Sequence, residues 1–230
     1  MQTWNTLAYL VFPYIALTIF VVGHIYRYRK DPFRWNAKSS ELLEKESLRY
    51  GSTIFHWGIL LTLLGHAGGL LIPQSIFDVF GIDAGAHTLI AFYSGIFIGF
   101  AAFIGSALLL YRRYRLPRIR VTTSTSDFIA LALLFFTAGI GLFNVFRHYN
   151  VLYTIAPWIR SIVFLHPEPE LMTEVPSGFK IHILSAFLLF AYSPFSRLIH
   201  IWSAPFGYMV RNYIVFRKYG GVSSENYGKE

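Results

Sequence analysis

The chain has 230 residues, of which 54% are hydrophobic and 14% charged, whereas a soluble domain usually carries about 25% charged residues; the composition therefore favours an integral membrane protein. The absence of cysteine excludes disulfides, haem attached through Cys-x-x-Cys-His and iron–sulfur clusters held by this chain. A net charge of +8 is compatible with nucleic-acid binding, but the basic residues gather at the ends of apolar segments, as in membrane proteins.

Five apolar segments are long enough to cross a bilayer, which takes about 20 helical residues. In chain order they cover about residues 7–26, 53–73, 87–110, 127–146 and 179–201. No segment alternates with the period of a barrel strand. The sequence therefore predicts an all-α fold, a single membrane domain over residues 1–230 built as a bundle of five transmembrane helices. The first segment lacks a preceding Lys or Arg and a following cleavage site, so we interpret it as a retained helix.

Lysine and arginine gather on one side of this layout. The connections after the first and third helices and the C-terminal tail hold 16 of them, and the opposite connections hold only Arg147 and Arg160. Because basic loops stay in the cytoplasm, we expect the N-terminus outside and the C-terminus inside, with residues 205–230 as a cytoplasmic tail. The outer segment 147–178 contains the short apolar run YTIAPWIRSIVFLHP, which predicts an interfacial helix.

Two of the five segments carry a pair of histidines. The second holds His56 and His66, and the fifth holds His182 and His200. An imidazole within a bilayer is costly without a partner, so these residues are functional candidates. Since the two helices run in opposite directions, we expect His56 to meet His200 near the inner side and His66 to meet His182 near the outer side. Two imidazoles fill both axial positions of a haem iron, and the pattern predicts two bis-histidine haems b across the membrane.

The two histidines lie closer together along the second segment than along the fifth. Along straight helices, His56 and His66 would lie about 15 Å apart and His182 and His200 about 27 Å apart. Ser193-Pro194 lies between the histidines of the fifth segment, and a proline kinks a helix. We therefore expect oblique ligation, a bend at this proline, or both.

Other residues could serve the same haems. Gly65, Gly68 and Gly69 flank His66, and small residues make room for a flat macrocycle or for close helix packing. Cations that could pair with haem propionates are Arg197, Arg112 and Arg113 on the inner side and Lys180 on the outer side, although each is equally explained as an interfacial anchor. We interpret His24, His148 and His166 as interfacial, and place His87 at the outer start of the third helix near the depth of His66.

Four stretches resemble a known family: FHWGIL at 55–60, GHAGGLLIP at 65–73, KIHIL at 180–184 and SPFSRLIHIWSAP at 193–205. They are similar to the gamma subunit of membrane-bound respiratory nitrate reductase. The resemblance implies a quinol-oxidising dihaem cytochrome b in the cell membrane. Its axial ligands match His56, His66, His182 and His200.

The resemblance also implies a quinol pocket beside the outer haem. There the second ring nitrogen of His66 would meet the quinol, with Gly65 next to it. A lysine of the family at the outer start of the third helix aligns with Ala86, so we expect His87 to take its place. The implied protein partners are a cytoplasmic iron–sulfur subunit and a molybdenum-containing catalytic subunit, which would receive electrons for nitrate reduction.

Three other functions remain open on the sequence alone. The chain could be the dihaem b subunit of another quinol-linked complex, of the sulfite-reductase or heterodisulfide type. It could be a transporter without haem that uses its intramembrane histidines as a proton relay. It could also be a passive anchor that only holds the partner subunits.

Overall fold

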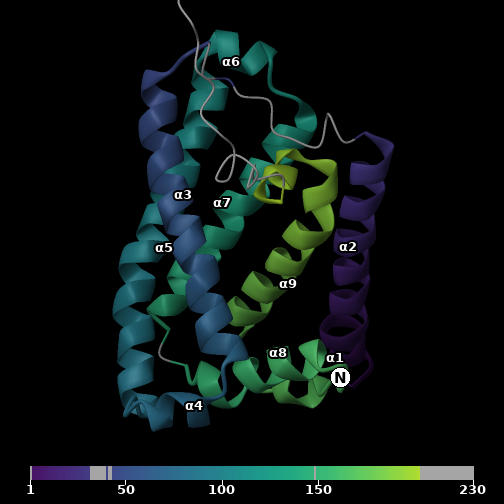
Figure 1. Ribbon diagram of the computed structural model, residues 1–230, viewed down its shortest axis with the longest axis vertical. Helices are drawn as coiled ribbons and strands as arrows, with labels where there is room; N and C mark the ends of the chain where they lie inside the picture. Colours follow the sequence, from purple (N-terminus) through teal and green to yellow (C-terminus); the bar gives the residue numbers. More distant parts are fainter. Residues whose placement is uncertain (1, 32–39, 41–42, 148, 203–230) are drawn as a thin grey trace, which may run out of the picture.

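The computed structural model describes residues 2–31, 40, 43–147 and 149–202, and these residues form helices and turns with no strand among them (Figure 1). Five stretches are long and apolar enough to span a membrane: Thr3–Lys30, Glu46–Leu71, Ala84–Arg115, Thr125–Val145 and Ser177–Phe195. The predicted all-α bundle of five transmembrane helices is thereby confirmed. The predicted tail at 205–230 lies outside the described residues.

The spanning stretches combine α-helices with short irregular turns. The first consists of α1 (Gln2–Thr6), the π-helical η1 (Leu7–Val11) and α2 (Phe12–Lys30). The second consists of α3 (Glu46–His66) and the π-helical η3 (Ala67–Leu71). The remaining three are α5 (Ala84–Arg115), α7 (Thr125–Val145) and α9 (Ser177–Tyr192). Shorter elements connect them: α4 (Gln74–Val79), α6 (Pro117–Val121), η4 (Val151–Tyr153), α8 (Ile155–Val163), η5 (Pro169–Met172), η6 (Ser193–Phe195) and η7 (Arg197–Ile201).

The spanning helices pack in the order α3, α5, α7, α9 and α2. In Figure 1, α4, α8 and the N-terminus lie at one end of the bundle, and α6 lies at the other. Since α5 and α7 come between α3 and α9 in this order, the two histidine-bearing elements are not packed extensively against each other. Their histidines therefore approach one another across the interior of the bundle.

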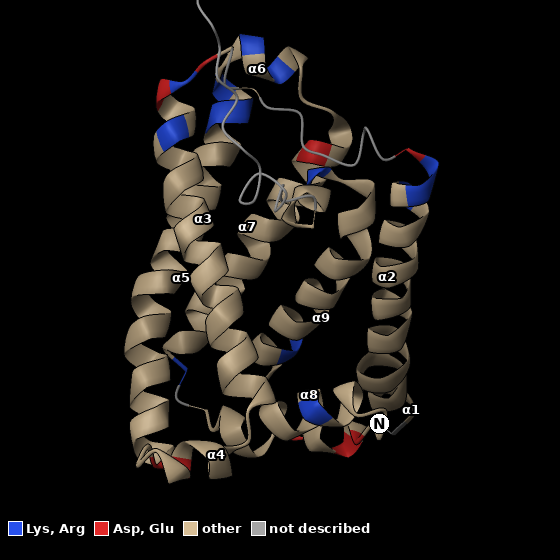
Figure 2. Cartoon of the chain, in the orientation of Figure 1, with Lys and Arg blue, Asp and Glu red and all other residues tan. Residues whose placement is uncertain are grey.

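The surface of the bundle has the polarity that a bilayer requires. Large apolar side chains on the spanning helices are exposed, among them Leu64, Phe97 and Phe143. Charged residues lie toward the two ends of the bundle, and the end that carries α6 has most of the Lys and Arg (Figure 2). Apolar side chains can face lipid without loss of free energy, so this chain is a multi-pass membrane protein. The assignment of the α6 end to the cytoplasm remains a prediction.

The α3–α5 contact depends on two glycines. A Cβ atom at Gly58 would lie 2.3 Å from the backbone nitrogen of Ala102, and one at Gly105 would lie 2.4 Å from that of Phe55. Such distances mean that the two helix backbones touch directly. Small residues permit this approach in membrane helices, and it fixes the position of α3, which carries His56 and His66.

Helix α8 closes the end of the bundle where the N-terminus lies. Its Trp158 is fully buried and donates a hydrogen bond of 3.0 Å to the Tyr9 carbonyl oxygen in η1. Arg160 donates to the Leu70 carbonyl oxygen in η3 at 3.0 Å. Both acceptors lie in π-helical turns, where the i→i+4 ladder is interrupted and carbonyl groups become accessible. The apolar run in residues 147–178 thus forms a helix docked on two spanning stretches.

The fifth spanning stretch does not continue as one helix to residue 201. α9 ends at Tyr192, Pro194 lies in the 3-10 turn η6, and Ser196 is extended, with φ −128° and ψ −176°. His200 therefore lies on the separate turn η7. The expected bend at Pro194 takes the form of a break, because proline lacks the N–H group that would extend the ladder.

The α7 start holds this broken segment in place. Arg197 Nε forms an ion pair of 2.6 Å with Asp127 Oδ1, and Ser126 Oγ donates to the Phe195 carbonyl oxygen at 2.8 Å. Asp127 also belongs to the capping box that begins α7 at Ser124. The position of His200 is thus set by α7 rather than by continuation of α9.

We predict that Gly105→Ala destabilises the protein, because the added methyl group must separate the α3 and α5 backbones. Overpacking of this kind costs about 1–3 kcal/mol, and the thermal unfolding midpoint in detergent should fall. The control is Gly68→Ala, since a Cβ at Gly68 meets no described atom within 4 Å. Equal midpoints for both variants would contradict the close approach.

Candidate functional site

Toward the α6 end of the bundle, His56 from α3 meets His200 from η7. Their ring centroids lie 5.9 Å apart with an angle of 66° between the ring planes. A hollow of about 400 Å³ opens along this face of α3, lined by Ser52, Thr53, His56, Trp57 and Leu60. The structure thus brings together the predicted inner pair.

Toward the other end, His66 from α3 meets His182 from α9. Their ring centroids lie 6.0 Å apart with an interplanar angle of 37°. Cβ atoms added at Gly65 or Gly68 would meet no described atom within 4 Å. The predicted outer pair is therefore also brought together, with open space along the small residues beside His66.

The four imidazoles share one hydrogen-bonding pattern. In each, Nδ1 lies against a backbone carbonyl oxygen: Ser52 for His56 at 2.7 Å, Thr62 for His66 at 2.8 Å, Thr137 for His182 at 3.0 Å and Arg197 for His200 at 2.6 Å. A carbonyl oxygen only accepts, so Nδ1 must carry the hydrogen. In a neutral ring, Nε2 then holds the lone pair, which is the arrangement of metal-binding histidines.

The ring separations fit one metal atom between each pair. Two metal–imidazole bonds of about 2.0 Å in line place the ring centroids roughly 6 to 6.5 Å apart, close to the observed 5.9 and 6.0 Å. No group of three or more His, Cys, Asp or Glu side chains that could hold a metal occurs in the described part of the chain. Each pair could thus supply two ligands to one metal atom.

Gly141 is a site residue that the sequence analysis missed. A Cβ atom there would lie 2.7 Å from Cε1 and 3.1 Å from Nδ1 of His182. Gly141 follows Thr137 by one helical turn, so the missing side chain lets the His182 ring reach the Thr137 carbonyl oxygen. In the sequence, Gly141 is one of two glycines within the same apolar helix, the other being Gly139. Nothing in the sequence distinguishes the two, so Gly141 could not have been identified from it.

Unpaired polar atoms lie on the same face of α7. Thr137 Oγ1 and both amide atoms of Asn144 are buried without a hydrogen-bond partner among the described residues. Asn144 Oδ1 would lie 2.5 Å from a Cβ at Gly178, one turn before His182. Buried polar groups almost always have partners, so these atoms are exceptions among the described residues, and they lie on the helix that holds the His182 ring.

The predicted propionate partners differ in their surroundings. Arg112 is buried and gives Nε to Glu44 Oε2 at 2.9 Å, Nη1 to Ser40 Oγ at 2.9 Å and Nη2 to the Glu44 carbonyl oxygen at 2.7 Å. Its donors are therefore committed to the segment before α3, and we do not retain Arg112 as a propionate partner. Arg113 donates to Thr123 Oγ1 at 3.1 Å.

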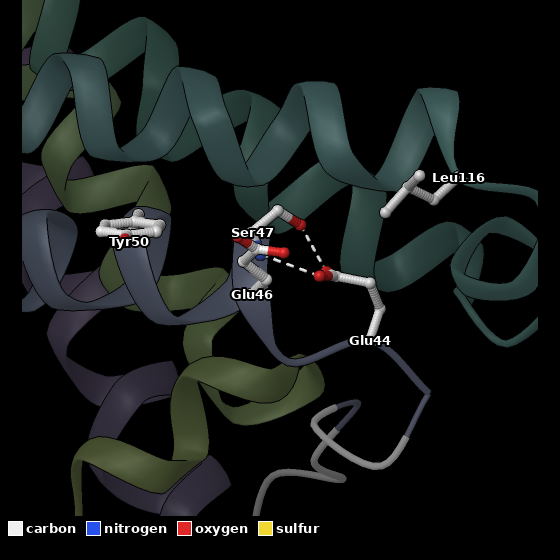
Figure 3. Close-up of a pocket in the computed structure, with 5 residues that line it drawn as sticks. All are labelled: Glu44, Glu46, Ser47, Tyr50 and Leu116. Atoms are coloured by element: carbon white, nitrogen blue, oxygen red, sulfur yellow. Dashed lines mark hydrogen bonds between the residues drawn. The ribbon is translucent and has the colours of Figure 1, made fainter.

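Glu44 binds Ser47 as well as Arg112. Its carboxylate accepts from the Ser47 backbone N–H at 2.8 Å and from the Ser47 hydroxyl (Figure 3). These bonds, followed by those of Arg112, lower the pKa of Glu44 to about 2. A lowered pKa means that the contact stabilises the fold above the ordinary glutamate pKa and is lost only as the pH falls toward 2. A hollow of about 340 Å³ lies beside it, lined by Glu44, Glu46, Ser47, Tyr50 and Leu116.

Two other predicted cations keep positions near the histidines. Arg197, three residues before His200, forms an ion pair with Asp127. Lys180 Nζ donates to the Thr173 carbonyl oxygen at 3.0 Å and lies 6.0 Å from the Tyr9 ring centroid. Their roles toward propionates remain predictions.

The remaining histidines lie in different environments. His24, expected at the interface, is buried between Phe20 and Trp202, with ring centroids 4.7 and 6.2 Å away. His166 is exposed, and His148 lies outside the described residues. His87 is 7% exposed in the first turn of α5, and its Nδ1 lies 2.8 Å from Gln74 Oε1.

Comparison with known proteins places the chain in one family. Residues 5–219 match the family described as the nitrate reductase gamma subunit. The chain is 44% identical to the nitrate reductase gamma chain of Bacillus subtilis (strain 168) over 213 residues, 90% of this chain and 96% of that protein. It is 33% identical to the respiratory nitrate reductase 2 gamma chain of Escherichia coli (strain K12), covering 94% of this chain and 98% of that protein.

A more distant relative covers less of the chain. The Hdr-like menaquinol oxidoreductase cytochrome b-like subunit of Archaeoglobus fulgidus is 30% identical over 155 residues, 64% of this chain and 45% of that protein. The gamma-chain matches are both longer and closer. The chain therefore belongs to the nitrate reductase gamma subunit family and is a membrane subunit of a nitrate reductase complex.

Proposed function

We propose that this chain is the quinol-oxidising cytochrome b subunit of its nitrate reductase and that it holds two haems b. The observation that carries the proposal is the pair of imidazole couples, His56 with His200 and His66 with His182, at ring separations of 5.9 and 6.0 Å. In all four rings the Nδ1–H group is bonded to a carbonyl oxygen, so Nε2 can bind iron. When bound, the two haems supply one-electron carriers at two depths of the membrane.

The surroundings of the outer pair support a macrocycle there. Gly65 and Gly68 leave open space beside His66, and the Gly141 backbone lies against the His182 ring. A flat apolar ring fits this open space beside the two histidines. Arg197 near the inner pair and Lys180 near the outer pair are the cations we propose for its propionates.

Residues at the end of the bundle that carries α4 and α8 form the proposed site of quinol oxidation. The quinol enters from the bilayer at the end that carries α4 and α8, beside His66 and Gly65, with His87 at the same end. Its protons leave on that side, which we propose faces outward. Helix α8 covers the site through its bonds to Tyr9 and Leu70, and thereby limits the access of water.

The opposite end carries the partner surface. Arg118 and Arg120 on α6 are exposed, next to Arg115 at the end of α5. We propose that this basic surface faces the cytoplasm and docks an iron–sulfur subunit, which passes electrons to a molybdenum-containing catalytic subunit. Complementary charges speed association and fix its orientation.

The other functions considered receive less support. Membership in the gamma subunit family favours nitrate reductase over a sulfite-reductase or heterodisulfide-type complex. A proton relay without haem would need ring nitrogens that exchange protons along a path, whereas each Nδ1–H here is bonded to a backbone carbonyl that cannot pass a proton on. A protein that only anchored its partners would not require two pairs of histidines whose rings are separated by the distance that a shared metal atom requires.

We predict that His182→Ala and His66→Tyr each remove one of two b-type haems and abolish quinol-driven nitrate reduction by the complex, because each removes an axial ligand. Reduction driven by artificial donors that feed the soluble subunits should be unchanged. The haem is measured by the dithionite-reduced spectrum, and the matched control is His166→Ala on the exposed loop. Two intact haems in either ligand variant would refute the pairing.

We further predict that Gly141→Ala perturbs the outer haem alone, since its methyl group displaces the His182 ring from the Thr137 carbonyl oxygen. The low-spin EPR signal of one haem should shift or disappear while that of the other stays. Gly139→Ala is the matched control on α7, because its Cβ would lie 3.1 Å from the movable Phe103 ring edge. Identical spectra for Gly141→Ala and the unaltered complex would contradict the proposed contact.

Reversing a charge on the basic surface should weaken subunit docking. We expect Arg120→Glu to raise the amount of iron–sulfur subunit lost on washing the membranes with salt, with both haems retained. Arg147→Glu is the control, because Arg147 is exposed beyond the opposite end of α7. If Arg147→Glu released the partner and Arg120→Glu did not, the proposed orientation of the chain would be reversed.

A further inference from the structure

His87 differs from the four paired histidines in its hydrogen-bond partner, which is a side chain and not a backbone carbonyl group. It lies in the first turn of α5 and is only 7% exposed, and its ring packs on Phe77 of α4 at a centroid distance of 4.3 Å. Its Nδ1 lies 2.8 Å from Gln74 Oε1. Nε2 has no hydrogen-bond partner among the residues that the structure describes, so one ring nitrogen is held and the other is available.

The bonds of Gln74 determine which nitrogen of His87 carries the hydrogen. Gln74 Nε2 donates to Asp78 Oδ1 at 2.8 Å and to the Ile82 carbonyl oxygen at 2.9 Å. Both partners accept only, which fixes the amide orientation and leaves Oε1 to face His87. Oε1 cannot donate, so Nδ1 of His87 carries the hydrogen. In the neutral ring, Nε2 is therefore a lone-pair acceptor.

That acceptor faces the small residues beyond His66. His87 Nε2 lies 3.6 Å from the position that a Cβ at Gly69 would occupy. Gly69 follows His66 by three residues in η3, next to Gly68, where added side-chain atoms would meet open space. A flat molecule that enters along these glycines would bring a polar group within reach of Nε2.

The outer pair itself has no comparable acceptor to offer. His66 Nδ1–H is given to Thr62 and His182 Nδ1–H to Thr137, and under the proposed function both Nε2 atoms bind iron. That the second ring nitrogen of His66 meets the quinol stays a prediction, but its hydrogen bond to the Thr62 carbonyl oxygen leaves it no lone pair with which to accept. A quinol hydroxyl is a donor, and it needs an acceptor that is not already occupied.

We propose that His87 Nε2 is the acceptor of a quinol hydroxyl proton and that Gln74, fixed by Asp78 and Ile82, is its positioning residue. This inference rests on the proposed function. In the step, the quinol O–H bond breaks, its bonding electrons stay on the quinol oxygen, and the proton bonds to Nε2. The resulting quinol anion is the electron donor of the proposed function, and its second hydroxyl proton is released on the same side of the membrane when it is oxidised to the quinone. The Gln74 contact persists throughout, because Nδ1 carries a hydrogen in both the neutral and the protonated ring.

The test uses the whole nitrate reductase complex with menadiol, a naphthoquinol, as the electron donor. In His87→Phe, which keeps the contact with Phe77, kcat/KM for menadiol should fall by about 100-fold or more, within the range of a lost general base. Both haems and dye-driven nitrate reduction should be retained. Ser75→Ala on the exposed side of α4 is the matched control and should behave as the unaltered complex does.

Gln74 variants test the positioning role separately. Gln74→Leu removes the acceptor opposite Nδ1, and its kcat should fall at least about 10-fold, as for other lost partners of functional histidines. Gln74→Glu combined with Asp78→Asn, whose amide can donate to the new carboxylate, keeps an acceptor there and should recover much of that loss. An equal loss in both variants would overturn the tautomer argument, and undiminished menadiol oxidation by His87→Phe would overturn the proton acceptor itself.

The outcomes separate this inference from the proposed function. A complex whose His66→Tyr variant still oxidises menadiol, or whose unaltered form contains no b-type haem, contradicts the proposed function. If His66→Tyr is inactive but His87→Phe and Gln74→Leu are fully active, the quinol proton goes elsewhere and only the further inference is lost.

Discussion

The hydrogen bond from imidazole Nδ1 to a backbone carbonyl oxygen is the interaction on which the site depends. It occurs at all four paired histidines, at 2.6 to 3.0 Å. Within a membrane the alternative is an unpaired polar group in a region of low dielectric, which costs free energy. The bond therefore fixes the ring orientation, satisfies one nitrogen and leaves the other as a ligand.

Three of the rings take that carbonyl from their own element and one takes it from a neighbour. His56 and His66 use the oxygen one turn earlier in α3, and His200 uses that of Arg197 in η7. His182 instead reaches across to Thr137 in α7, which requires a glycine at 141. The α7–α9 contact is thus under a constraint that the α3 histidines do not share, and changes in α7 act on the outer site first.

The sequence could predict what depends on hydropathy and on helix direction. Apolar length identified the five spanning stretches, and antiparallel direction placed His56 with His200 and His66 with His182. It could not identify Gly141, because its role depends on which neighbouring helix supplies a ring. The sequence also did not show that Arg112 differs from the other candidate propionate partners. Its hydrogen-bond partners Ser40 and Glu44 lie about 70 residues earlier in the chain. Hydropathy records what faces lipid and carries no information about hydrogen bonds between distant segments.

The break at Pro194 allows the two histidines of the fifth stretch to meet those of α3, although they are 18 residues apart in the chain and those of α3 only 10. A straight helix from His182 to His200 would be much longer than the α3 distance from His56 to His66. The structure ends α9 at Tyr192 and turns the chain through η6 and an extended Ser196 before η7 begins. Such a turn leaves backbone groups without helical partners, and inside a membrane these must be satisfied by the protein. Ser126 binds the Phe195 carbonyl oxygen and Asp127 binds Arg197, so the polar start of α7 stabilises the break that allows His200 to face His56.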